Sequence, residues 1–141
     1  MYTRDHLLVS LAVGVALVLA PLDLAQSPAV VVAAAAVAGT VIDLDHFLVA
    51  RLRTGTWLAL RRGLARPRRL LFAQDELFAD GEVGVLHRLL SHVVLGGVAV
   101  SVLGLLAPSL ALVVGVSLYA HVLADLLADV RSVEYVVKNS A

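Results

Sequence analysis

Ionisable side chains of the types that bind divalent metals interrupt the apolar stretches of this sequence. Asp43, Asp45 and His46 close a run of Ala and Val residues that begins at Ala29. Ionisable groups at membrane depth cost about 3 kcal/mol or more each unless they face one another or a polar cavity. Partners must therefore come from elsewhere in the chain, and the candidates also lie beside apolar runs: His6, His87, His92, His121 and Asp125.

The composition is that of an integral membrane protein. Of the 141 residues, 60% are apolar and 16% charged, against about 45–50% and 25% in soluble domains, and the mean hydropathy is +0.93. The length predicts one membrane-embedded helical domain over residues 1–141. The formal charge is zero, so nothing indicates a nucleic-acid partner, and the absence of cysteine excludes thiolate metal sites.

The apolar runs predict four helices. An N-terminal signal peptide is an alternative for the first run, but a retained helix fits better because Arg4 and Asp5 cancel in charge and Pro21 follows the only obvious cleavage point. We therefore expect an all-α, integral membrane, four-helix up-down-up-down bundle, ending in a polar tail from Arg131. The expected helices cover residues 7–22, 29–51, 86–106 and 110–128.

The expected topology brings the ionisable residues together. Each apolar run is about 14–18 residues long, whereas about 20 residues span a bilayer, so the polar motifs must form the ends of the spans. In an up-down-up-down bundle, the start, end, start and end of successive helices share one membrane face. All the motifs occur at those four ends.

Helical spacing supports this convergence in part. His121 and Asp125 are four residues apart and share a helix face. Asp43 and His46 are three apart and do the same, whereas Asp45 lies off their face unless the helix end unwinds.

Imidazole and carboxylate groups together suit Zn²⁺ best, with Mn²⁺ or Fe²⁺ as alternatives. His87 and His92 are five residues apart, so both can contribute only if the helix bends or its first turn is irregular. One ion is expected, with Asp43 and His46 completing its shell or holding a second ion. Singly, each histidine could instead be a hydrogen-bonded interfacial residue. The predicted ligands are His6, Asp43, His46, His87, His92, His121 and Asp125.

One long connection carries most of the positive charge. Its arginines are interleaved with Trp57 and leucines, which is typical of a segment lying against anionic headgroups, although a solvated basic loop is an alternative. The opposite turns carry no Lys or Arg, so the positive-inside rule predicts that the motifs, both termini and this segment face the cytoplasm of a cell membrane. Seven of the eleven basic residues lie here: Arg51, Arg53, Arg61, Arg62, Arg66, Arg68 and Arg69.

The order of the motifs resembles a known family. A histidine opening the first helix, Asp-x-Asp-His, His-Arg-x-x-Ser-His and His-x-x-x-Asp are similar to the motifs of membrane-bound, metal-dependent hydrolases, some of them LexA-regulated proteins of the bacterial inner membrane. The resemblance extends from His6 to Asp125 and implies a hydrolase. Three positions depart from the family pattern: Ile42 replaces Pro, Leu89 replaces Gly and Val93 replaces Ser. These departures leave a catalytically inactive member as an alternative.

The leading functional prediction is a metal-dependent hydrolase acting on a lipid or other amphiphilic ester, such as a phospholipid, presented by the bilayer. Asp45 is expected to support a metal ligand or act as a general base, and Arg88 to contact an anionic substrate oxygen. A small membrane transporter or metal-handling protein is the main alternative, because intramembrane Asp and His also line ion pathways.

Overall fold

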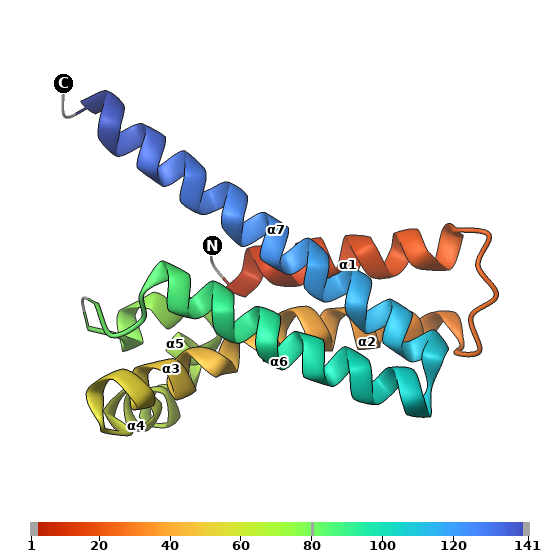
Figure 1. Cartoon of the computed structure of the whole chain (residues 1–141), viewed down its shortest axis with the longest axis horizontal. Helices are drawn as coiled ribbons and strands as arrows, with labels where there is room; N and C mark the ends of the chain where they lie inside the picture. The colour runs from red at the N-terminus through yellow and green to blue at the C-terminus, as the bar shows by residue number, and fades with distance from the viewer. Residues whose placement is uncertain (1–2, 80, 140–141) are drawn as a thin grey trace.

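The chain folds into helices joined by short connections. The computed structural model describes residues 3–79 and 81–139, and no strand occurs within them (Figure 1). The elements are α1 (Thr3–Leu19), α2 (Pro28–Val41), the 3₁₀ turn η1 (Ile42–Leu44), α3 (Asp45–Thr54), α4 (Leu58–Ala65), α5 (Pro67–Phe72), η2 (Gln74–Leu77), α6 (Val85–Leu106) and α7 (Pro108–Asn139).

Three of the described helices are long and apolar enough to cross a membrane. They are the continuous path of α2, η1 and α3 (Pro28–Thr54), α6, and the Pro108–Val133 part of α7. Helix α1 has 17 residues, or about 26 Å at 1.5 Å per residue, slightly less than a hydrocarbon core of about 30 Å. The expected all-helical membrane class is thus supported by three helices, and α1 packs along α2 and α7.

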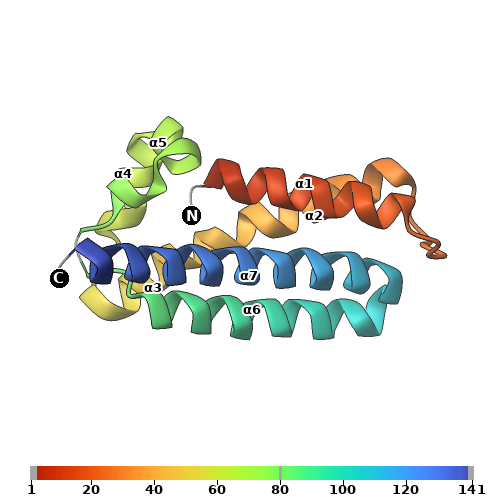
Figure 2. The ribbon, with the colours of Figure 1, turned by 90° about the horizontal axis from the view of Figure 1, so that it is seen from above.

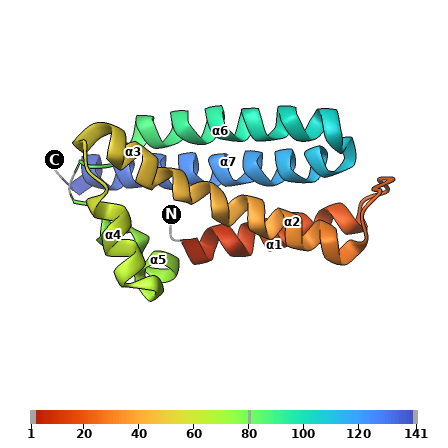
Figure 3. The same ribbon diagram turned by 90° about the horizontal axis from the view of Figure 1, so that it is seen from below.

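The two short turns lie next to each other at one end of the structure. Only Ala107 separates α6 from α7, so these helices run antiparallel (Figure 3). The backbone N–H of Ala25, in the turn after α1, donates to Oγ of Ser109 at 3.0 Å, and that hydroxyl donates to Oε1 of Gln26 at 2.8 Å. The start of α1 and the α3–α5 region lie at the opposite end (Figures 1 and 2).

An apolar cluster fills the space between α1, α2 and α7. Leu17, Val31, Ala35 and Val113 are buried there. A Cβ on Gly14 would lie 2.9 Å from Cα of Val32, so glycine allows the α1 and α2 backbones to approach this closely. Small residues at helix contacts are typical of membrane bundles, where dispersion contacts rather than water exclusion hold helices together.

The outer face of α6 is apolar and exposed. The exposed side chains include Val93, Val98, Val102 and Leu105, the last at 88%. A monomer in water rarely exposes a continuous apolar face of this kind, whereas lipid tails would cover it.

The connection between α3 and α6 is not a free solvated loop in its described residues, 55–79 and 81–84. Phe47 and Ala50 of α3 pack with Ala59 of α4 and Leu77 of η2 in a second apolar cluster, which anchors the segment to the bundle.

Helix α7 continues well past the expected end at Ala128. The predicted helix end is wrong, because α7 remains helical through the polar stretch that begins at Arg131, as far as Asn139, and extends beyond the start of α1 (Figure 1). The physical reason is that no Pro or Gly follows Gly115 in the sequence to stop the helix.

Candidate metal centre

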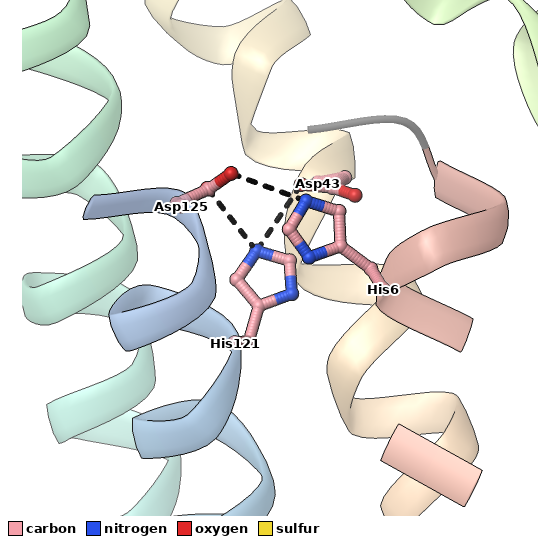
Figure 4. A group of neighbouring side chains, drawn as sticks. All are labelled: His6, Asp43, His121 and Asp125. Atoms are coloured by element: carbon pink, nitrogen blue, oxygen red, sulfur yellow. Dashed lines mark ion pairs between the residues drawn. The ribbon is translucent and has the colours of Figure 1, made fainter. Parts of the chain in front are cut away.

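Six of the predicted ligands converge in two groups at the end of the bundle opposite the turns. The ligand atoms within each group lie within 4.8 Å of one another, and Asp43 belongs to both groups. The first group is His6 of α1, Asp43 of η1, and His121 and Asp125 of α7 (Figure 4). The second is Asp43, His46 of α3 and His92 of α6.

The separations between these atoms match metal ligation better than hydrogen bonding. Two ligands about 2.05 Å from a tetrahedral ion lie about 3.3 Å apart, and cis ligands of an octahedral ion lie about 2.9 Å apart. Nε2 of His121 is 3.3 Å from Oδ1 of Asp43 and 3.6 Å from Oδ2 of Asp125. Nε2 of His6 is 3.2 Å from Oδ1 of Asp125. Hydrogen bonds between such groups are about 2.7–3.2 Å long, so most of these contacts are too long for that role.

The far nitrogens of two histidines make hydrogen bonds of normal length. Nδ1 of His121 lies 2.8 Å from the carbonyl oxygen of Gly39. Since a carbonyl can only accept, Nδ1 carries the proton and the Nε2 lone pair faces the cluster. Nδ1 of His92 similarly lies 2.7 Å from Oδ2 of Asp45. Metal-binding histidines are usually held in orientation by a hydrogen-bond acceptor on the ring nitrogen that does not bind the metal.

The inward nitrogens of three of the four histidines are buried without hydrogen bonds. Among the described residues, none accepts from or donates to Nε2 of His46, His92 or His121 within hydrogen-bond geometry. The side chains of His92 and His121 are 0% exposed. A buried polar atom without a partner costs about 1–3 kcal/mol, and a divalent ion would provide the partner. The cluster can therefore bind a metal.

Asp45 reaches the cluster because the helix is distorted at η1. Each residue of a 3₁₀ turn advances about 120° rather than 100°, which rotates Asp45 towards the face that carries Asp43. Its side chain is 2% exposed and contacts His92. The helix is therefore tightened at this point rather than unwound, and Asp45 reaches the cluster by a different distortion from the one expected from the sequence.

Arg88 contacts carboxylates of α7. Its Nη2 lies 2.6 Å from Oδ2 of Asp129, and its Nε lies 3.6 Å from Oδ2 of Asp125. These contacts indicate that Arg88 orients Asp125. Asp129 had no signal in the sequence beyond its position four residues after Asp125.

His87 lies outside both groups. It is exposed on α6, whereas His92 is buried. Because α6 is regular from Val85, five residues correspond to about 140° of rotation at 100° per residue. No bend brings His87 to the same face.

Two residues near the centre were not assigned a site role from the sequence. Gly39 supplies the carbonyl that orients His121, although its small size had indicated a close helix contact. Ser10 is 1% exposed and packs against Gly39, where a Cβ would lie 1.7 Å from its Oγ. The only signal for Ser10 is its position one helical turn after His6.

The fold and the site together define a class: an all-helical protein with membrane-length helices and a buried His/Asp cluster that can bind a divalent metal. In comparisons with known proteins, no family model, curated protein or solved structure matches the chain.

Proposed function

We propose that the chain is a metal-dependent hydrolase of the cell membrane that acts on an amphiphilic phosphoester, such as a phospholipid, from the cytoplasmic side. The observation that carries the proposal is the set of inward-facing Nε2 atoms at ligand spacing from Asp43 and Asp125. When bound, a divalent ion, with Zn²⁺ preferred, would polarise the scissile bond and make water acidic enough to attack near neutral pH.

The protein's own residues have separate tasks in this proposal. Asp45 holds His92 in the ligating orientation, and because it belongs to neither ligand group we assign it the proton-accepting role. Arg88 fixes Asp125 through its contacts to α7. The apolar surroundings strengthen these interactions by excluding water.

A lipid substrate is supported by the surface beside the centre. Trp57, Leu58 and Leu64 are exposed at 45%, 47% and 67%, and Arg61 and Arg66 are exposed on the same short segment. Basic residues with interleaved apolar side chains suit an anionic interface, at about 1 kcal/mol per basic residue near the surface. Figure 3 shows α4 at the same end of the structure as α3 and the start of α1, the elements that carry His46 and His6 of the metal centre.

The distribution of basic residues supports a cytoplasmic site and an up-down-up-down insertion of four helices, with α1 as the short span. The connections at the other end, residues 20–27 and Ala107, contain no Lys or Arg. Cysteines placed at the exposed positions Asp23 and Arg66 should react with membrane-impermeant reagents from opposite sides. Labelling of both from one side would contradict the topology.

A transport function is less well supported by the described residues. A pathway would need polar groups through the depth of the bundle. Below the cluster, Leu17, Val31 and Val113 instead form a buried apolar core, with Val31 at 1% and Val113 at 0% exposure.

The hydrolase proposal is tested by substrate turnover in a native-like lipid bilayer. Protein loaded with Zn²⁺ or Mn²⁺ should release product from phospholipids, His121→Ala should abolish release, and His87→Ala should retain it. Turnover of soluble phosphoesters alone would refute the lipid substrate. No turnover of either class by metal-loaded protein would refute the hydrolase and favour an inactive or metal-handling protein.

A further inference from the structure

We propose that the centre holds two divalent cations in unequal subsites that share Asp43. The closed subsite consists of His6, Asp43, His121 and Asp125, and the open subsite consists of Asp43, His46 and His92. The inference deepens the hydrolase proposed above, and its catalytic meaning rests on that function. Its metal-binding content can be tested separately.

The number of inward-facing groups exceeds the capacity of one tetrahedral ion. Six side chains meet in the cluster, whereas zinc takes four ligands. The histidines also form two stacked pairs, while His92 and His121 meet edge to face across the subsites with ring centroids 5.0 Å apart. The rings of His6 and His121 are stacked with centroids 3.9 Å apart, and those of His46 and His92 are stacked with centroids 5.2 Å apart. Each pair belongs to a different subsite.

Asp43 is placed to bridge the subsites. Its Oδ1 lies 3.3 Å from Nε2 of His121 in the closed subsite. The same oxygen lies 3.7 Å and 3.9 Å from Nε2 of His92 and His46 in the open subsite. A carboxylate shared by two ions is a common feature of two-metal hydrolytic sites, where the ions lie about 3.5–4 Å apart.

The two subsites differ in access. The side chains of the closed subsite are at most 4% exposed, whereas that of His46 is 13% exposed. Four protein ligands in a sealed environment are typical of a structural ion. Three protein ligands with solvent access leave a position for water or substrate. The open subsite is therefore the one expected to exchange its ion faster and to face the substrate.

Charge is consistent with a second ion. Four carboxylates (Asp43, Asp45, Asp125 and Asp129) and one guanidinium (Arg88) carry a net charge of −3 in this cluster. With one divalent ion bound, the net charge of the cluster is −1, which would repel a phosphoester anion. With two ions bound, the net charge is +1, which would attract it.

The test is the metal content of the purified full-length protein after loading with Zn²⁺ and removal of free ion. The wild type should hold two ions per chain, His6→Ala and His46→Ala one each, and the exposed control His87→Ala two. In His46→Ala the remaining ion should exchange more slowly than the ions of the wild type. One ion in the wild type, or two in both ligand variants, would overturn the proposal.

A second measurement requires no substitution, and so it remains decisive if a variant fails to fold. Wild-type protein loaded with two equivalents of Mn²⁺ should give an exchange-coupled electron paramagnetic resonance spectrum, because a carboxylate joins the ions. A spectrum of isolated Mn²⁺ at that loading would overturn the shared ligand. One bound ion with phosphoester turnover would refute the two subsites but not the hydrolase. Two bound ions without turnover of any ester would refute the hydrolase but not the two subsites.

Discussion

Replacing Gly39 with alanine should separate α1 from α2 and empty the subsite of the metal centre that contains His6. A Cβ at this position would lie 1.7 Å from Oγ and 2.8 Å from Cβ of Ser10, whereas ordinary contacts begin at 3.4 Å. Rotating the serine side chain can move Oγ but not its Cβ. Relief therefore requires a shift of α1, which also carries His6. Ligand positions must hold to within about 0.2 Å for metal binding, so even a small shift would remove His6 from the site.

The expected loss of stability follows from overpacking, and the expected loss of bound metal follows from the displaced ligand. Inserting a methyl group into a packed contact costs about 1–3 kcal/mol, and we expect Gly39→Ala to lower the stability in detergent by that amount. The bound metal should fall by one ion per chain. The matched control is Gly39→Ala with Ser10→Gly, which removes both clashing atoms and leaves Ser117 Oγ at 3.4 Å as the nearest of the neighbouring atoms. The double variant should regain metal, and a double-mutant cycle would show this as coupling between positions 10 and 39.

The assays are thermal unfolding and metal analysis of wild type, both single variants and the double variant. Unchanged metal content and stability in Gly39→Ala would refute the argument that this contact positions α1. A double variant no better than Gly39→Ala would show that the damage arises from the helix backbone rather than from Ser10.

Three further predictions concern the surroundings of the centre. Asp45→Ala should weaken metal binding by about 10–100-fold, as loss of a hydrogen-bond partner of a metal ligand usually does. A titration showing unchanged affinity would contradict its orienting role for His92. Asp129→Asn should lower the free energy of unfolding by about 1–2 kcal/mol, because it weakens a charge-assisted hydrogen bond from Arg88. It should leave the metal content unchanged, and loss of metal would instead make Asp129 part of the site. Chelation should lower the unfolding temperature by removing about 3 kcal/mol or more of binding free energy at saturating metal, with recovery on adding Zn²⁺, and a metal-independent unfolding temperature would argue against a folded-state metal centre.

The sequence alone determined the class of the protein and most of the residues that meet. Apolar runs of membrane length can be recognised without tertiary information, because helices in lipid must satisfy every backbone hydrogen bond internally. Ionisable residues inside such runs must also find one another, which predicted that His6, Asp43, His121 and Asp125 would converge. The LexA-regulated hydrolase resemblance and the cytoplasmic orientation are still predictions.

The tertiary structure decided which residues face the centre and how they are supported. His87 and His92 have the same residue type and similar apolar surroundings in the sequence, and only the rotation of α6 against its neighbours buries one and exposes the other. The position of Asp45 in the cluster depends on a 3₁₀ turn, and no residue in Ile42–Leu44 requires that turn. The roles of Ser10 and the Gly39 carbonyl were equally inaccessible, because a contact between two helices depends on their separation and rotation, and neither is encoded locally in the chain.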